Sequence, residues 1–181
     1  MAGSRSRSRP RPPSAGDALW DDPSVWSEEA EQVFARAIRR GRWELLVGRL
    51  RGTRATLLSF EEATRGLPVT TPIDLGTRTV PLAKVVGSVN KDGDFTRSFH
   101  PVSEALRARW KRAYAVARGM RGYHPVELYQ LGDMYFVLDG HFRVSVAREL
   151  GSDSIRARVR SWLSTGPRVG ANPSPAVDSV S

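Results

Sequence analysis

The chain has no cysteine and little histidine, and these shortages narrow the chemistry open to it. Without cysteine there is no disulfide bond, no cysteine-ligated zinc site and no iron–sulfur cluster. The three histidines, His100, His124 and His141, are too scattered to predict a metal site. No apolar run approaches the roughly 18 residues of a membrane span, and the arginine-rich N-terminus lacks the apolar stretch of a secretory signal. We therefore expect a cytoplasmic protein without a membrane partner.

Arginine is what the chain has in abundance. Lysine and arginine together number 28 against 19 aspartates and glutamates, and the formal net charge is +9. Only Lys84, Lys91 and Lys111 are lysines. This excess permits binding to nucleic-acid phosphates, although a genome that favours arginine codons explains it equally well. A length of 181 residues suits one domain with a single core.

Composition divides the chain into four segments. Residues 1–18 and 164–181 are rich in Pro, Ser, Gly and Arg, and we expect both to be disordered tails. Residues 19–68 predict a helical N-terminal extension that is basic. A solvated polar face explains those charges more simply than a DNA contact does. Residues 69–163 predict the main domain, of mixed α/β (α+β) class.

Hydrophobic periodicity predicts the order β-α-β-β-α-β for this domain. The expected strands and helices are, in chain order, 79–86, 103–118, 126–130, 134–138, 141–150 and 155–159. In the extension, Gly41 is expected to break or bend a helix that Ser27 caps. A long loop, 87–101, follows the first strand, and loops of that length in compact domains are commonly functional.

The most informative position is the start of the last helix, where an apolar run turns through Gly140. Such a turn exposes unpaired backbone N–H groups, to which the helix dipole adds partial positive charge. Arg143 falls on the core side of the first turn, where its guanidinium needs an anionic partner. That partner is either the phosphate of a bound nucleotide or nucleic acid, or a carboxylate in an internal ion pair. The candidate carboxylates are Asp139, Glu127 and Asp133.

Residues 139–148 read Asp-Gly-His-Phe-Arg-Val-Ser-Val-Ala-Arg. With this box, residues 80–159 resemble the ParB/sulfiredoxin-like superfamily, most closely its short bacterial members, and depart from their pattern at Phe142. The resemblance implies a ParB/sulfiredoxin-like core and a nucleotide, CTP or ATP/ADP, bound at Gly140 and Arg143. His141 stands where sulfiredoxins have their cysteine. Because the chain has no cysteine, their thiolate chemistry is excluded.

In this family the loop after the first strand closes over the nucleotide site, and here it keeps Asp94, Phe95, Arg97 and Phe99. Lys91 and Arg97 are candidate phosphate ligands, and Asp94 is a candidate ligand for a bridging Mg²⁺. The alternative is that the two phenylalanines pin the loop to the core while its charges are solvated.

Together these patterns predict a nucleotide- or phosphate-binding regulatory module without fast turnover. We expect His141 to bind phosphate, with an affinity that rises as pH falls through about 6.5. One alternative is a DNA-associated, partition-type protein that holds the phosphate backbone through its basic helices. Another is a small nucleotide-dependent kinase or nucleotidase that uses His141, Asp94 or Glu127. A homodimer is compatible with each of these.

Overall fold

The computed structural model describes residues 26–67, 71–91, 93–119 and 124–162. The two predicted disordered tails lie outside these residues. The strands are β1 (Leu58–Ser59), β2 (Ile73–Pro81), β3 (Val85–Ser88), β4 (Val126–Leu131), β5 (Met134–Asp139) and β6 (Ser154–Trp162). The helices are α2 (Ser27–Leu50), α3 (Phe60–Thr64), α4 (Arg107–Arg118) and α5 (His141–Glu149), with short 3-10 turns η1 (Leu82–Lys84) and η2 (Glu104–Leu106).

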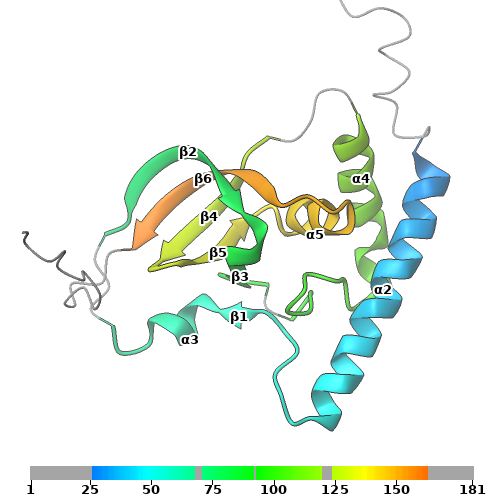
Figure 1. Cartoon of the computed structure of the whole chain (residues 1–181), viewed down its shortest axis with the longest axis horizontal. Coiled ribbons are helices and arrows are strands. Elements are labelled where there is room, and N and C mark those ends of the chain that lie inside the picture. Colours follow the sequence, from blue (N-terminus) through cyan, green and yellow to red (C-terminus); the bar gives the residue numbers. More distant parts are fainter. Residues whose placement is uncertain (1–25, 68–70, 92, 120–123, 163–181) are drawn as a thin grey trace, which may run out of the picture.

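The strands form one six-stranded mixed sheet in the order β1-β3-β5-β4-β6-β2. The β4–β5 hairpin and the β2–β6 pair are antiparallel, and the other neighbours run parallel. Helix α5 packs beside the sheet, α4 packs on α5, and α2 packs on α4 as the outermost layer (Figure 1). The mixed α/β class predicted from the sequence is confirmed.

The predicted first strand, 79–86, is divided between two strands. β2 ends at Pro81, which has no N–H to donate to a ladder, and a 3-10 turn separates it from β3. In that turn the Leu82 N–H donates to the Asp153 carbonyl at 2.9 Å. β2 then lies at one edge of the sheet beside β6, whereas β3 lies beside β5. Within residues 69–163 the observed order is thus the predicted one with its first strand split in two. The sixth strand, β1, comes from the segment predicted as a helical extension and pairs with β3.

Gly41 does not break the first helix, because α2 is continuous from Ser27 to Leu50. The glycine is buried where another segment crosses the helix, and a Cβ there would lie 2.4 Å from the Pro101 carbonyl oxygen. A close approach of two backbones therefore explains this glycine, at a cost in helix propensity of about 1 kcal/mol.

Two apolar clusters hold α5 in place. The first packs α5 against the sheet and includes Val137 and Val144, together with Phe95 and Phe99 of the 87–101 loop. Both phenylalanines are fully buried, so they pin this loop to the core. The second cluster joins α2, α4 and α5 around Trp110, whose indole N–H donates to the Ser145 hydroxyl at 2.9 Å. None of the helices in the described residues is long and apolar enough to cross a membrane.

Candidate anion-binding site

The turn from β5 into α5 creates the site. Gly140 occupies the N-cap position with φ 102° and ψ 24°, a left-handed conformation, and no side chain caps the first turn. A Cβ at Gly140 would lie 2.6 Å from Val126 Cγ1 and 2.9 Å from Arg143 Nη2. Both the backbone conformation and the space therefore require glycine. The predicted strand-glycine-helix junction is confirmed, and no side chain accepts the N–H groups of the first turn.

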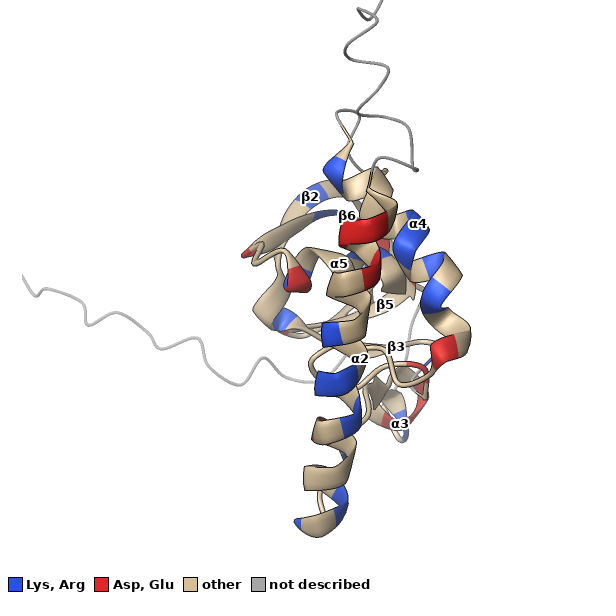
Figure 2. Cartoon of the chain, turned by 90° about the vertical axis from the view of Figure 1, so that its right-hand side faces the viewer, with Lys and Arg blue, Asp and Glu red and all other residues tan. Residues whose placement is uncertain are grey.

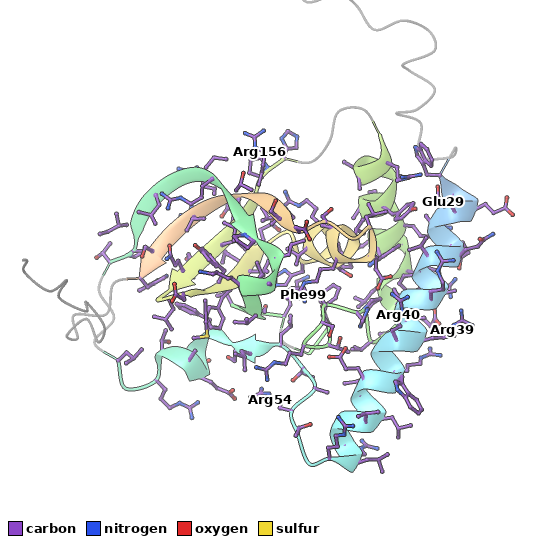
Figure 3. All side chains as sticks on the ribbon, viewed as in Figure 1. Glu29, Arg39, Arg40, Arg54, Phe99 and Arg156 are labelled. Carbon is purple, nitrogen blue, oxygen red and sulfur yellow. The ribbon has the colours of Figure 1, made fainter. Side chains whose placement is uncertain are left out.

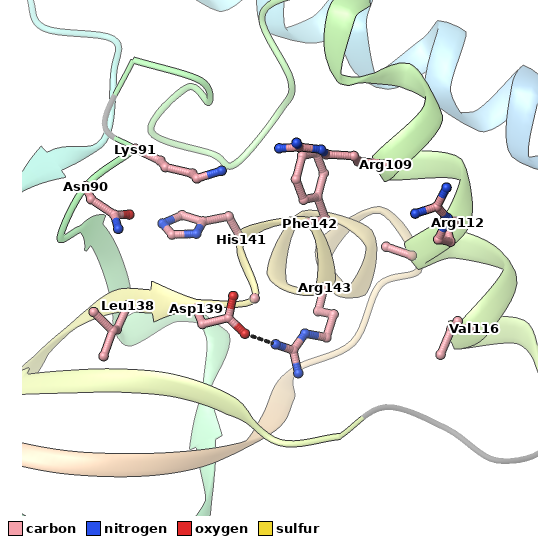
Figure 4. A pocket seen from close by; sticks show the side chains of 12 residues that line it. Asn90, Lys91, Arg109, Arg112, Val116, Leu138, Asp139, His141, Phe142 and Arg143 are labelled. Carbon is pink, nitrogen blue, oxygen red and sulfur yellow. Dashed lines mark hydrogen bonds and ion pairs between the residues drawn. The ribbon is translucent and has the colours of Figure 1, made fainter.

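A cavity of about 510 Å³ opens at this helix start, a volume typical of small-molecule sites (Figure 4). Its lining combines four cations, one carboxylate and an apolar part. The cations are Lys91, Arg109, Arg112 and Arg143, and the carboxylate is Asp139. The apolar lining residues are Ala113, Val116, Leu138 and Phe142, and the others are Asn90, Gly140 and His141. Three positive charges are left after Arg143 and Asp139 are paired.

Arg143 uses the internal partner that the sequence left open. Its Nη2 bonds Asp139 Oδ2 at 2.5 Å, and its Nη1 donates to the carbonyls of His124 and Pro125 at 2.7 and 3.0 Å. The other two candidate carboxylates pair elsewhere, Glu127 with Arg160 and Asp133 with Lys84. These bonds occupy three of the five guanidinium donors, so Arg143 ties the chain just before β4 to α5 and has two further donors.

His141 lines the cavity but is only 3% exposed. Its Nε2 lies 2.8 Å from the Ser88 hydroxyl oxygen, and its ring also hydrogen-bonds the Val137 backbone. Burial, together with the charge of nearby Lys91, lowers the pKa of His141 to about 4. The imidazole of the ligand-free chain is therefore neutral at pH 7, and the pH dependence of phosphate binding stays a prediction. Sequence reasoning could not foresee this burial, because the box does not reveal what covers its histidine.

The Ser88–His141 contact also shapes the loop that carries Lys91. The Ser88 hydroxyl oxygen accepts the backbone N–H groups of Asn90 and Lys91, at 3.2 and 2.7 Å. This turn brings the Lys91 ammonium to 5.9 Å from the centre of the Phe142 ring. Phe142 itself packs edge-on against Phe95 with ring centres 5.5 Å apart. The loop thus approaches the helix start, and Asn90 and Lys91 are its contribution to the cavity lining.

Two cavity residues, Arg109 and Arg112, were not among the candidates from the sequence. They belong to a stripe at i, i+3, i+4 and i+7 on α4 that also contains Ala113 and Val116. The spacing of these four residues along α4 was visible in the sequence and could have indicated a separate face of the helix. It was hidden by a stronger apolar face around Trp110, and by basic residues Arg107 and Lys111 that pair with Glu31 of α2.

Three other candidates lie outside the cavity lining. Arg97 is exposed, and its backbone N–H donates to the Ala55 carbonyl at 2.7 Å. Asp94 is partly buried in the same loop, and Glu127 lies on β4. Within the described residues no three histidine, aspartate or glutamate side chains are grouped to hold a metal ion. Magnesium binding through Asp94 and phosphate binding by Arg97 stay predictions.

The basic extension that suggested DNA binding is partly neutralised by ion pairs. Arg40 contacts Glu149 at 3.2 Å, Arg42 contacts Glu104 at 3.1 Å, and Arg54 pairs with Glu62. Figure 3 shows Arg40 directed toward the body of the protein and Arg39 directed away from it. Several arginines of this segment therefore join α2 and the following chain to the rest of the fold.

Comparisons with known proteins give one structural likeness. No protein-family model matches the chain, and no curated protein matches it. The chain is similar to a solved structure of sulfiredoxin from Arabidopsis thaliana, at 17% sequence identity and a TM-score of 0.35. The match covers 47% of this chain and 84% of the sulfiredoxin chain. Because likeness at this level supports neither a substrate nor a reaction, function is argued from the geometry of the site.

Proposed function

We propose that the chain binds the phosphate groups of a nucleotide in the cavity at the N-terminus of α5. The observation that carries this proposal is the meeting of four cations and an uncapped helix start around one cavity. Lys91 comes from the 87–101 loop, Arg109 and Arg112 come from α4, and Arg143 comes from α5. Clustering such charges without a ligand is unfavourable because they repel one another. A polyanion such as a di- or triphosphate would relieve that repulsion.

The rest of the cavity suits the nucleoside. Phe142, Leu138 and Val116 give it an apolar side on which a base can pack. Figure 4 shows Arg109 beside the Phe142 ring and Arg112 farther along α4, so cations and apolar groups alternate around the opening. Phosphates among the four cations and a base against the apolar side chains would together fill the cavity. We assign no particular base, because every nucleobase offers an apolar face.

Binding without fast turnover fits the groups nearest the helix start. His141 has hydrogen bonds to Ser88 and Val137, and its low pKa makes it a weak base. Asp139 is held in its ion pair with Arg143. A kinase or nucleotidase would need a free acid or base within reach of the phosphates. We therefore propose a nucleotide-responsive binding module, with turnover well below the usual enzymatic range of about 1 per second.

The test is calorimetric titration of the full chain with nucleoside di- and triphosphates, with and without Mg²⁺. Arg109→Ala and Arg112→Ala each remove an exposed cation from the cavity without touching the core. Each loses a charge-assisted hydrogen bond to phosphate, so we expect affinity to fall by roughly tenfold or more. Arg143 is a poorer choice, because its removal also leaves the His124 and Pro125 carbonyls without their donor.

Arg39→Ala is the matched control, because Arg39 is an exposed arginine on the outer face of α2 and lies outside the cavity lining. It changes the net charge by the same amount, so it should leave the affinity nearly unchanged. If Arg39→Ala weakens binding as much as the cavity variants do, the attraction is a general effect of net charge. Unaltered affinity in an Arg109→Ala/Arg112→Ala double variant would also contradict the proposed site.

A further inference from the structure

The last two turns of α2 present an apolar ridge to solvent. Trp43, Leu46 and Leu50 are 67%, 48% and 77% exposed, and Val47 lies among them. With 3.6 residues per turn, these four side chains share the helix face opposite buried Gly41 and Gly48. Figures 1 and 2 show this end of α2 extending beyond the sheet and the other helices. We call these four residues the α2 ridge.

Basic side chains flank the α2 ridge on both sides. Residues 36–54 contain seven arginines and a single glutamate. That glutamate, Glu44, is already engaged by the His100 ring and by Ser98. In the described part of the chain no carboxylate pairs with Arg39, Arg49 or Arg51, and all three are exposed. The surface around the α2 ridge therefore carries an uncompensated positive charge.

The α2 ridge stands between two hollows. One, of about 560 Å³, is lined by Leu46 and Arg49 together with Thr53 of the following turn. The other, of about 620 Å³, is lined by Trp43, Val47, Arg40 and Arg51. Glu44 also lines it and is bonded there by Ser98 and His100 from the loop side. Each hollow therefore combines an apolar wall from the ridge with an arginine. A partner with protruding side chains could place apolar groups against the ridge and acidic groups beside these arginines.

We propose that the α2 ridge docks an acidic amphipathic segment of another protein, with two or three apolar side chains flanked by aspartates or glutamates. A second copy of this chain would bring two arginine-rich surfaces together, and the like charges oppose that contact. DNA phosphates would use the arginines but would leave Trp43 and Leu50 in water. A bilayer surface would cover the ridge itself, whereas the hollows on either side are recessed from it and offer room for individual side chains. An acidic amphipathic segment complements the apolar ridge, the exposed arginines and the two hollows.

A fluorescence-anisotropy titration of the full chain tests the proposal. The probe is a labelled synthetic helix with leucine at i, i+3, i+4 and i+7 and glutamate at most other positions. The double variant Leu46→Glu/Leu50→Glu removes apolar anchors and adds repulsive charge, so binding should weaken by at least tenfold, an effect of about 1.4 kcal/mol. Arg49→Gln/Arg51→Gln should weaken binding less and should flatten its dependence on salt.

Ile73→Glu is the control, because Ile73 is 49% exposed on β2 and lines neither of the two hollows beside the ridge. Binding kept in Ile73→Glu and lost in the double variant supports the proposal. Equal binding to a scrambled peptide of the same composition would overturn it, because charge alone would then suffice. The proposal is also overturned if the amphipathic peptide does not bind. Ridge-dependent binding to phosphatidylserine vesicles, or ridge-dependent self-association, in place of peptide binding would likewise overturn it.

Discussion

The two ends of α5 lie at histidines whose pKa values are shifted in opposite directions. At the N-terminal end, burial and nearby Lys91 lower the pKa of His141 to about 4. At the C-terminal end, burial also acts to lower the pKa of His100, but hydrogen bonds to Glu149 and Glu44 outweigh it and raise the pKa. Burial thus acts in the same direction on both rings. The neighbouring groups decide the direction of each pKa shift. His141 has a hydroxyl and a cation beside it, whereas His100 has two carboxylates.

The helix dipole acts in the same sense as these partners. Its positive end disfavours an imidazolium at His141 and favours an incoming anion there. Its negative end lies at Glu149, where His100 Nε2 approaches at 3.1 Å and Arg40 at 3.2 Å. One end is therefore electrostatically unsatisfied and faces a cavity, whereas the other is closed by an ion-pair cluster. This contrast supports a ligand at the first end and a structural latch at the second.

The largest expected effect comes from the glycines at the two ends. Gly140→Ala combines a left-handed backbone with a Cβ overlapping Val126, so we expect it to destabilise the fold by about 3 kcal/mol. Gly151→Ala is its natural control, because Gly151 has φ 73° and nothing within 4 Å of the added carbon. The backbone term alone should cost about 1 kcal/mol there. Urea denaturation compares the two, and equal losses would show that crowding at Gly140 has no energetic weight.

The sequence predicted the glycine junction because its determinants are local. An apolar strand, a glycine and a helical pattern follow one another in the chain, and the structure keeps that order in β5, Gly140 and α5. The β4–β5 hairpin at Gly132 was predicted for the same reason, and Gly132 has a positive φ of 57° there. Features that depend only on residues close together in the sequence could thus be predicted.

Features that depend on contacts between distant segments of the chain could not be predicted from the sequence. Gly41 reads as a helix breaker until Pro101 is known to cross α2 at that point. Arg109 and Arg112 became cavity residues only because α4 packs on α5. The low pKa of His141 follows from burial and from Lys91, which lies fifty residues earlier in the chain. Each of these three misses therefore concerns tertiary contacts.

The second effect is of similar size and is a loss of stability in acid, caused by His141 at the N-terminal end of α5. His141 has its ordinary pKa near 6.5 when unfolded and about 4 when folded, so the unfolded chain binds its proton first. Its stabilising contribution is complete above pH 6.5 and is lost as pH falls toward 4. The difference corresponds to about 3 kcal/mol.

Urea unfolding over this pH range measures that loss. His141→Gln should show a shallower decrease, whatever its stability at neutral pH. His124→Gln serves as the control, because it alters an exposed histidine that belongs to neither end of α5. Identical acid slopes in wild type and His141→Gln would mean that the imidazole is not held neutral in the folded protein.

The smallest effect has the opposite sign and comes from the C-terminal end. The pKa of His100 is raised in the folded state, so its contribution to stability is complete below the unfolded value of 6.5. That contribution is lost as pH rises through the folded pKa, because the neutral ring no longer balances Glu149 and Glu44. Unfolding free energies measured from slightly acidic to slightly alkaline pH should decline in wild type. His100→Gln should remove the decline, and His124→Gln should keep it. Stability that instead rises with pH in wild type and in both variants would show that the two carboxylates do not control His100.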